Sequence, residues 1–289
     1  DVRFFIFFLH PMLAAEIAKY VGVPLEETSM RRFSNDNLYI QLLASVRSRR
    51  VYIVQSLCQS VNDHLVELLM MIDIARSSAA KEIIAIIPYF SFARSDKKDS
   101  PRISITARLV ADLIKTAGAT QVMTMVLHSP QVHGFFSVPT DHLTSRPVIL
   151  DYFRQRDLSD TIVVAPDLGG AKSAARFAKD LGLPMTAGNK ERVSDTKVII
   201  SSLVGGQMHG KKKALIYDDE IATGGTILEM SDVLIREGIE EIWVACTHGV
   251  FVRNALQRIC AVPQITELVT TDTVPQTVND PKLHVLCTA

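Results

Sequence analysis

Residues 214–226, with the sequence ALIYDDEIATGGT, restrict the possible folds of this chain more than any other stretch. An apolar run of strand length ends in two carboxylates, Asp218 and Asp219, and a Thr-Gly-Gly-Thr turn then opens a helical pattern. We therefore expect a buried strand, an acidic loop and the start of a helix. Gly224 and Gly225 permit backbone torsions that other residues resist, and the amides at a helix start attract a phosphate.

The same stretch predicts a pocket for a phosphorylated sugar, because carboxylates beside a helix start could hold hydroxyl groups or a divalent cation. The alternative is an ordinary strand-to-helix turn with a solvated acidic pair, since short motifs also match by chance. The local pattern leaves both interpretations open.

The composition excludes several classes of protein. At 289 residues, 47% hydrophobic and 21% charged, the chain has the make-up of a globular protein with two domains or one large one. Because 31 basic residues balance 31 acidic ones, no overall field recruits nucleic acid or a membrane surface, and neither is expected as a partner.

The start of the chain and the cysteines bear on location. The apolar residues 3–9 are too short to span a bilayer and lack the layout of a signal peptide, so we expect a buried first strand. The cysteines show no Cys-x-x-Cys spacing, which predicts neither a disulfide framework nor a zinc site and favours a cytoplasmic location. They are Cys58, Cys246, Cys260 and Cys287.

Strand and helix patterns alternate along the chain, which predicts mainly parallel sheets flanked by helices, an α/β fold. The same order restarts after residue 145, so we expect two similar domains, 1–145 and 146–289. Predicted strands cover 38–43, 51–55, 83–88, 122–127, 161–165, 184–187, 214–217 and 242–247, and predicted helices cover 11–20, 62–77, 105–117, 171–181 and the stretches that end near 238 and 259. Polar loops are expected at 31–37, 88–102 and 269–276, and the stretch after residue 188 looks mobile.

Ligands of open parallel sheets gather at the carboxyl ends of the strands. The loop 88–102 mixes aromatic and charged groups, which would suit a base and phosphates, although a solvated charged loop fits equally. His128 follows a predicted strand and is a candidate ligand or acid, although a lone histidine is usually structural. A second acid-plus-glycine turn lies at 166–172.

These loops carry a set of ordered motifs along nearly the whole chain. They are Arg32-Phe33-Ser34, Ser45-Val46-Arg47, Val54-Gln55-Ser56, Val61-Asn62-Asp63, Ala93-Arg94, Asp96-Lys97-Lys98-Asp99, Thr124-Met125, Leu127-His128, Gly134-Phe135-Phe136, Pro166-Asp167, Gly169-Gly170-Ala171-Lys172, Lys190-Glu191-Arg192, residues 214–226, Thr247-His248-Gly249 and Pro275-Gln276. In these motifs the chain resembles the ribose-phosphate pyrophosphokinase family. The resemblance implies two phosphoribosyltransferase-like domains and the transfer of a diphosphoryl group from ATP to the 1-hydroxyl of ribose 5-phosphate, with AMP as the second product.

The resemblance also implies roles for individual residues. A mobile loop with Lys190 and Arg192 would close over the transferring group, and His128 and Asp167 would position Mg²⁺ on the triphosphate. The ribose 5-phosphate site would comprise Asp167, Asp218, Asp219, Ala222, Thr223, Gly224, Gly225 and Thr226. The ATP site would comprise Asn37, Arg94, Ser95, Asp99, His128 and, from a neighbouring subunit, Phe33 and Asn35.

A homo-oligomer, a hexamer built from dimers, is implied as well. An allosteric site for phosphate or ADP would draw on Ser45, Arg47, Arg102 and Gln131.

Several positions depart from the family's pattern. An acid is usual at Asn37, glutamine at Ser95, and aspartate at Val126 and at Ala222, while Phe7-Phe8-Leu9 replace a loop with glycine and serine. The first three departures motivate an alternative function, a non-catalytic subunit associated with an active pyrophosphokinase. A phosphoribosyltransferase would share the loop 214–226, but it would not need the nucleotide residues of the first half.

Overall fold

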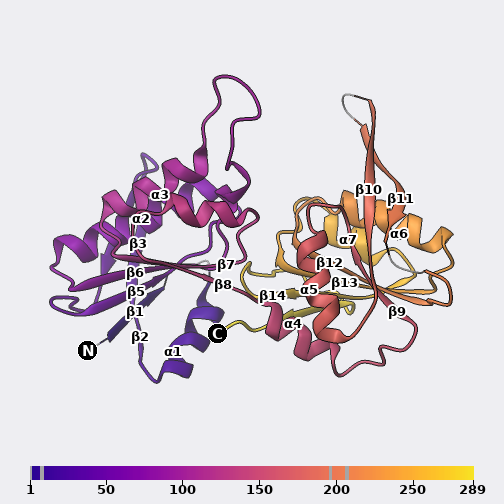
Figure 1. Cartoon of the computed structure of the whole chain (residues 1–289). Coiled ribbons are helices and arrows are strands. Elements are labelled where there is room, and N and C mark those ends of the chain that lie inside the picture. The colour runs from indigo at the N-terminus through magenta and orange to yellow at the C-terminus, as the bar shows by residue number, and fades with distance from the viewer. Residues whose placement is uncertain (1, 7–9, 195–196, 206–207) are drawn as a thin grey trace. The chain divides into compact units, whose positions relative to one another are not determined.

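The computed structural model describes the chain except residues 1, 7–9, 195–196 and 206–207, and it describes only the backbone at residues 6, 190–194 and 197–201 (Figure 1). The chain forms two compact units. Unit 1 comprises residues 1–144, 273–275 and 289, and unit 2 comprises residues 145–272 and 276–288. Across the described residues, no helix combines the length and the apolar character needed to cross a bilayer.

Unit 1 is built on a six-stranded sheet in which all neighbouring strands are parallel, in the order β2-β1-β5-β6-β7-β8. The strands are β1 (Val2–Ile6), β2 (Leu25–Glu26), β5 (Arg50–Val54), β6 (Glu82–Ile87), β7 (Gln121–Met125) and β8 (Thr140–Leu143). The helices are α1 (Pro11–Val21), α2 (Val61–Ser77) and α3 (Thr106–Ala117), with the short 3-10 turns η1 (Ser91–Arg94) and η2 (Pro130–Phe135).

The core of unit 1 lies on both faces of this sheet. Apolar residues of α2 and α3, such as Leu68 and Ile114, pack with Ile53 in one cluster, and Ala14 of α1 packs with Phe4 in another. Figure 1 shows α2 and α3 on one side of the sheet and α1 on the other. Because both faces of this sheet are covered, its central strands carry apolar residues on both faces. The continuous apolar run 83–87 is therefore typical of a strand in this position.

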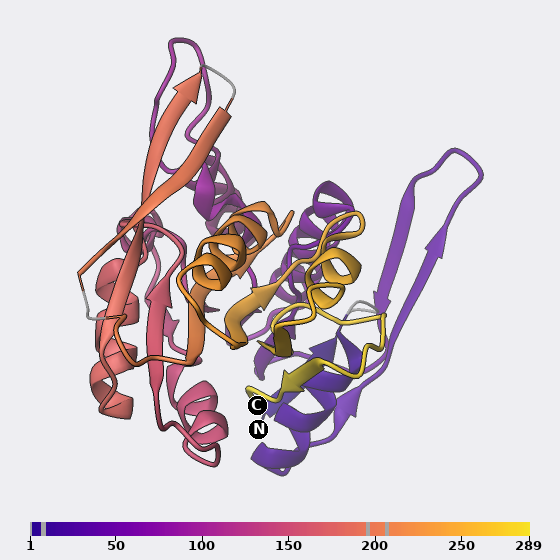
Figure 2. The same ribbon diagram turned by 90° about the vertical axis from the view of Figure 1, so that its right-hand side faces the viewer.

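A separate antiparallel hairpin, β3 (Thr28–Arg32) and β4 (Leu38–Leu42), projects from unit 1 (Figure 2). The prediction of a polar loop at 31–37 is wrong for its first two residues, since Arg31 and Arg32 belong to β3. Pairing with β4 extends the strand, and the Arg31 guanidinium lies 4.7 Å from the centre of the Tyr39 ring across the ladder.

Unit 2 contains a seven-stranded sheet in the order β11-β10-β9-β12-β13-β14-β15, parallel except for β11. Phe177 and Phe153 lie in the core on one face, and Met230 and Ile259 in the core on the other. The strands are β9 (Thr161–Ala165), β10 (Met185–Ser194), β11 (Lys197–Val204), β12 (Lys213–Ile221), β13 (Glu241–Gly249), β14 (Ile265–Thr271) and β15 (Leu283–Leu286), and the helices are α4 (Arg146–Phe153), α5 (Ala171–Leu181), α6 (Gly225–Arg236) and α7 (Ala255–Cys260).

Three predicted loops of unit 2 are strands in part. Residues 189–194, expected in a loop, continue β10 and pair with β11, where the β-branched run 198–200 favours a strand. The acidic pair lies inside β12, because its ladder with β13 continues to Ile221. The loop predicted at 269–276 begins only after Thr271, where β14 ends. The short strands β2, β8 and β15 carry too few residues to show a period and were not predicted.

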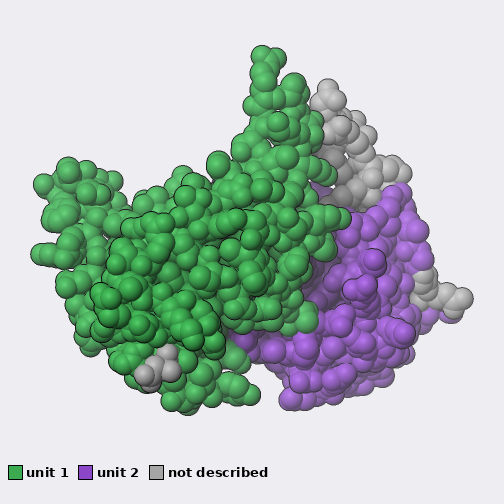
Figure 3. All heavy atoms as spheres, turned by 60° about the vertical axis from the view of Figure 1, so that its left-hand side comes forward, with its two compact units in different colours: residues 1–144, 273–275, 289 green, residues 145–272, 276–288 purple. Residues whose placement is uncertain are grey.

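The last part of the chain contributes to both units. Figure 3 shows the two units in separate colours. Residues 273–275 belong to unit 1, where the Ser56 hydroxyl donates a hydrogen bond to the Thr273 carbonyl over 2.6 Å and Val274 is buried. The chain then returns to unit 2, where β15 pairs with β14.

Candidate active site

The carboxyl ends of β9 and β12 bring the acidic residues of unit 2 together. The two strands are neighbours in the sheet, with Val164 opposite Ile216. Asp167 stands three residues after Val164, and Asp219 stands three residues after Ile216, so both reach the same edge of the sheet. This is the edge at which open parallel sheets bind their ligands.

Electrostatic repulsion is concentrated at Asp218. Burial raises the pKa of this carboxyl well above its ordinary value, and the negative charges of Asp219 and Asp167 raise it further. The Asp219 N–H donates to Asp218 Oδ1 over 2.9 Å, which fixes the first carboxylate. In the described part of the chain no group of three or more His, Cys, Asp or Glu side chains is placed to hold a metal ion. Carboxyl groups at this edge can accept hydrogen bonds from hydroxyl groups.

The turn after β12 requires glycine at residue 224. Gly224 is the N-cap of α6 and has φ +74°, in the left-handed region that disfavours other residues. A Cβ at this position would lie 2.9 Å from Cδ1 and 3.2 Å from Cγ1 of Ile259, in α7. Among the described residues, no side chain makes a capping hydrogen bond at this end of α6. The first amides of the helix therefore face the end of β12 with the partial positive charge that suits a phosphate.

Residues after β13 hold the end of β12 in place. The Val250 and Phe251 N–H groups donate to the Ile221 carbonyl over 3.0 and 3.1 Å, and the Val252 N–H donates to the Ala222 carbonyl over 3.0 Å. Gly249 begins this connection, and a Cβ there would lie 2.5 Å from the Phe251 ring.

Gln276 completes the connection, because its amide donates to the Gly249 carbonyl over 2.7 Å. Sequence reasoning assigned no role to Gly249 or Gln276. The signal was present in the motifs Thr247-His248-Gly249 and Pro275-Gln276, but only the fold shows that they support the loop after β12.

Asp167 is oriented by its own turn. Its Oδ1 accepts the Gly170 N–H over 3.1 Å, at the start of α5. A Cβ at Gly169 would lie 3.1 Å from the same oxygen, so a larger residue there would press on the carboxylate.

The backbone places Lys190 and Arg192 near this edge, although their side chains lie outside the described residues. The pairing of β10 with β9 ends at Ala187 opposite Ala165, and β10 continues with β11 as a two-stranded ribbon. Lys190 is three residues beyond that last pair, so the ribbon carries it past the carboxyl end of β9 by about 10 Å. Figure 1 shows β10 and β11 rising from the sheet.

The nucleotide candidates of unit 1 lie on three segments. Arg94 and Ser95 end η1 after β6, Asp99 follows in the same loop, and His128 follows the neighbouring strand β7; all four are exposed.

The other three candidates lie at the tip of the hairpin. The Phe33 N–H donates to the Asn37 carbonyl over 2.8 Å, and Asn35 Oδ1 accepts the Asn37 N–H over 3.2 Å. The Phe33 ring is 47% exposed, which leaves an aromatic face open to stacking.

The residues expected to bind a metal ion or an allosteric ligand lie on several different segments of the chain. His128 belongs to unit 1 and Asp167 to unit 2. Ser45 and Arg47 follow β4 and are exposed, Arg102 is exposed with φ +64°, and Gln131 in η2 accepts a hydrogen bond from the Ser129 hydroxyl over 2.6 Å.

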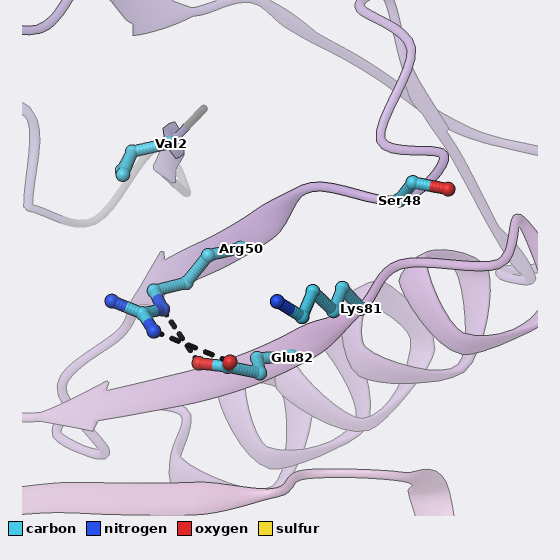
Figure 4. Close-up of a pocket in the computed structure, with 5 residues that line it drawn as sticks. All are labelled: Val2, Ser48, Arg50, Lys81 and Glu82. Carbon is cyan, nitrogen blue, oxygen red and sulfur yellow. Dashed lines mark hydrogen bonds and ion pairs between the residues drawn. The ribbon is translucent and has the colours of Figure 1, made fainter.

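A hollow of about 230 Å³ lies at the opposite, amino-terminal edge of the sheet in unit 1, lined by Val2, Ser48, Arg50, Lys81 and Glu82 (Figure 4). The guanidinium of Arg50 donates to both Glu82 oxygens, over 2.5 and 3.2 Å, so its charge is already matched. The strand ends that carry the acidic and glycine motifs do not contribute to it, and we do not regard it as the active site.

The parallel sheets, with the acidic pair near the end of β12 and the glycine turn after it, define an α/β protein of the phosphoribosyltransferase-like class. The N-terminal domain of ribose phosphate pyrophosphokinase matches residues 3–118, and the phosphoribosyl synthetase-associated domain matches residues 193–289. The chain belongs to the ribose-phosphate pyrophosphokinase family and is an enzyme of that type, a transferase.

Individual relatives agree with this assignment. A Streptomyces coelicolor protein provisionally named a ribose-phosphate pyrophosphokinase is 50% identical over 100% of this chain and 91% of its own length. The ribose-phosphate pyrophosphokinase of Deinococcus radiodurans is 45% identical over 91% of this chain and 82% of its own. The crystal structure of phosphoribosylpyrophosphate synthetase from Mycobacterium smegmatis has a TM-score of 0.92 at 35% identity and covers 99% of this chain and 94% of that one.

Proposed function

We propose that this enzyme transfers the diphosphoryl group of ATP to the 1-hydroxyl of ribose 5-phosphate, giving phosphoribosyl pyrophosphate and AMP, with Mg²⁺ as cofactor. The observation that carries the proposal is the meeting of Asp167, Asp218 and Asp219 with the uncapped start of α6 at one edge of unit 2. A sugar phosphate presents hydroxyl groups to the three carboxyl groups and a phosphate dianion to the start of α6.

Ribose 5-phosphate binds after β12 in this proposal. Amides from Thr223 to Thr226, with the two threonine hydroxyls, hold the 5-phosphate, and Asp218 and Asp219 accept hydrogen bonds from ring hydroxyls. Ala222 fits this scheme, because a phosphate held by backbone amides does not need an acidic side chain there. Its carbonyl is bound to Val252 and fixes the turn.

The transfer itself requires positioning and charge neutralisation more than covalent chemistry. The 1-hydroxyl attacks the β-phosphorus, the bond to the α-phosphate oxygen breaks, and AMP leaves. Lys190 and Arg192 supply positive charge to the transferring group from the β10–β11 ribbon. Arg94, Ser95 and Asp99 hold ATP. Phe33 stacks on the adenine, with Asn35 and Asn37 beside it. A second subunit of a hexamer contributes the hairpin that carries Phe33.

The donor set of this site fits a magnesium ion shared with the substrate. Asp167 offers a carboxylate oxygen, and burial together with the charges of Asp219 and Asp167 raises the pKa of Asp218, so a cation at this edge would stabilise its ionised form. Mg²⁺ keeps several waters and takes one or two protein carboxylates plus substrate phosphates, so a dedicated cluster of three ligands is not needed. Asp167 would hold the ion, which would supply positive charge to the triphosphate, and His128 would help to position it.

A coupled assay of AMP formation tests the proposal, with ATP, ribose 5-phosphate and Mg²⁺ present together. We expect AMP and phosphoribosyl pyrophosphate in equal amounts from the chain alone. Lys190→Ala should lower kcat at least 100-fold, corresponding to about 3 kcal/mol of transition-state stabilisation. No AMP from the wild-type chain would refute the proposal.

One observation favours the alternative of a non-catalytic subunit. Val126 stands two residues before His128, where the family usually has aspartate, so a carboxylate is missing beside the expected nucleotide and metal site. Separate titrations of the wild-type chain with ATP and with ribose 5-phosphate distinguish the two functions. Binding of ribose 5-phosphate without ATP, together with inactivity, would favour the subunit role.

A further inference from the structure

The loop that follows β7 is strained immediately before His128. Val126 adopts φ +40°, and the chain turns there from the strand towards η2. Strain of this kind persists only where the surrounding structure holds it.

Hydrogen bonds that the loop donates to residues of β8 help to hold it. The Val126 N–H donates to the Leu143 carbonyl over 3.0 Å, one residue beyond the last ladder pair of Met125 and Leu143. The Leu127 N–H donates to Nε2 of His142 over 2.9 Å. The Leu127 side chain is 5% exposed and packs in the core of unit 1. Leu127, which precedes His128, is thus held through both its backbone N–H and its side chain. His142 accepts the hydrogen bond from that N–H.

The contact defines the chemical state of the imidazole. Nε2 accepts a hydrogen bond only when it carries no proton, so the proton of the neutral ring resides on Nδ1. Desolvation lowers the pKa of His142, and the neighbouring His133 of η2 lowers it further, so the accepting form prevails at neutral pH. His133 is itself held 2.9 Å from the Thr140 carbonyl, on the same strand as His142.

We propose that His142 is a positioning residue for the ATP site. By accepting a hydrogen bond from the Leu127 N–H, His142 holds the strained loop in the conformation that presents His128 to ATP. The proposal rests on the role of His128 given under Proposed function. It predicts that loss of the acceptor weakens ATP use and leaves the ribose 5-phosphate site in unit 2 unchanged.

Three variants separate positioning from general stability. His142→Ala removes the acceptor. His142→Gln restores it, because the glutamine Oε1 and the histidine Nε2 stand the same number of bonds from Cα. Gln121→Ala removes the hydrogen bond of 2.6 Å between Gln121 and Asp141, which joins the same two strands away from the loop. We expect KM for ATP to rise about tenfold in His142→Ala, which is 1.4 kcal/mol, with KM for ribose 5-phosphate unchanged.

The rescue variant and the control complete the kinetic test. His142→Gln should recover most of the ATP affinity, and Gln121→Ala should keep the wild-type KM for both substrates. Equal rises in both KM values, no rescue by glutamine, or the same effect from Gln121→Ala would show that His142 acts only through the stability of β8.

A measurement without substrate tests the contact between His142 and Leu127 independently of the proposed reaction. Amide hydrogen exchange at Leu127, followed in the full-length protein, should accelerate about tenfold in His142→Ala and stay near the wild-type rate in His142→Gln. Unchanged exchange in His142→Ala would overturn the inference even if the wild-type enzyme is active. An inactive wild-type chain with accelerated exchange would refute the proposed reaction and keep the positioning contact.

Discussion

Gly224→Ala tests whether the loop after β12 is set by local backbone freedom or by packing against α7. Alanine at φ +74° costs about 1–2 kcal/mol. The added Cβ would lie 2.9 Å from Cδ1 of Ile259, so this fully buried side chain must shift, and such overpacking costs about 1–3 kcal/mol. We expect a total destabilisation of about 3 kcal/mol.

A matched control separates the two contributions. Gly182, after α5, has φ +69°, and a Cβ there would meet nothing within 4 Å. Gly182→Ala should therefore cost only the backbone strain, about 1 kcal/mol. The difference of about 2 kcal/mol between the variants is the packing contribution of the Gly224 contact.

Urea denaturation followed by tryptophan fluorescence measures both variants. Trp243 is the chain's single tryptophan, is 4% exposed and lies in β13, so its emission reports unit 2. With an m-value of about 2 kcal/mol/M, the midpoint should fall by about 1.5 M in Gly224→Ala and by about 0.5 M in Gly182→Ala.

Ile259→Val identifies the contact directly, because it removes Cδ1, the nearest atom to the added Cβ. The double variant should recover more than 0.5 kcal/mol relative to the sum of the single changes. Equal midpoint shifts for Gly224→Ala and Gly182→Ala would refute the packing argument. A lowered midpoint with an unchanged KM for ribose 5-phosphate would refute the link between this turn and phosphate binding.

Three further predictions follow. Burial raises the pKa of the Glu67 carboxyl from 4.5 to about 6, so ionisation of this group opposes folding by about 2 kcal/mol above pH 6 and does not oppose it below pH 4.5. Glu67→Gln should therefore be more stable than the wild type at pH 8 and show no such gain near pH 4.5. Urea titrations followed by circular dichroism measure the difference. Asp219→Asn should raise KM for ribose 5-phosphate at least tenfold with KM for ATP unchanged, and equal rises would contradict its role. Native alkylation with mass spectrometry should label the exposed Cys287 and spare Cys58 and Cys246, whose thiol pKa values are raised by burial.

Much of the candidate site was predictable from local sequence. Gly224 at a helix start and the paired Asp218 and Asp219 carry their chemistry in their residue types. Strand boundaries were less predictable, because β12 and β10 run past the points where their apolar patterns end. Pairing with β13 and β11 extends them, and pairing partners are not encoded in a local period.

The sequence by itself determined the alternation of strands and helices, the parallel sheets and the family, because side-chain period and ordered motifs are properties of the chain alone. Tertiary structure decided which of these residues meet. Ile259 against Gly224, Asp167 beside Asp218, and His142 under Leu127 each join segments far apart in sequence. Such contacts depend on strand order and register, which bring distant residues to one edge of a sheet, and no local pattern specifies that order.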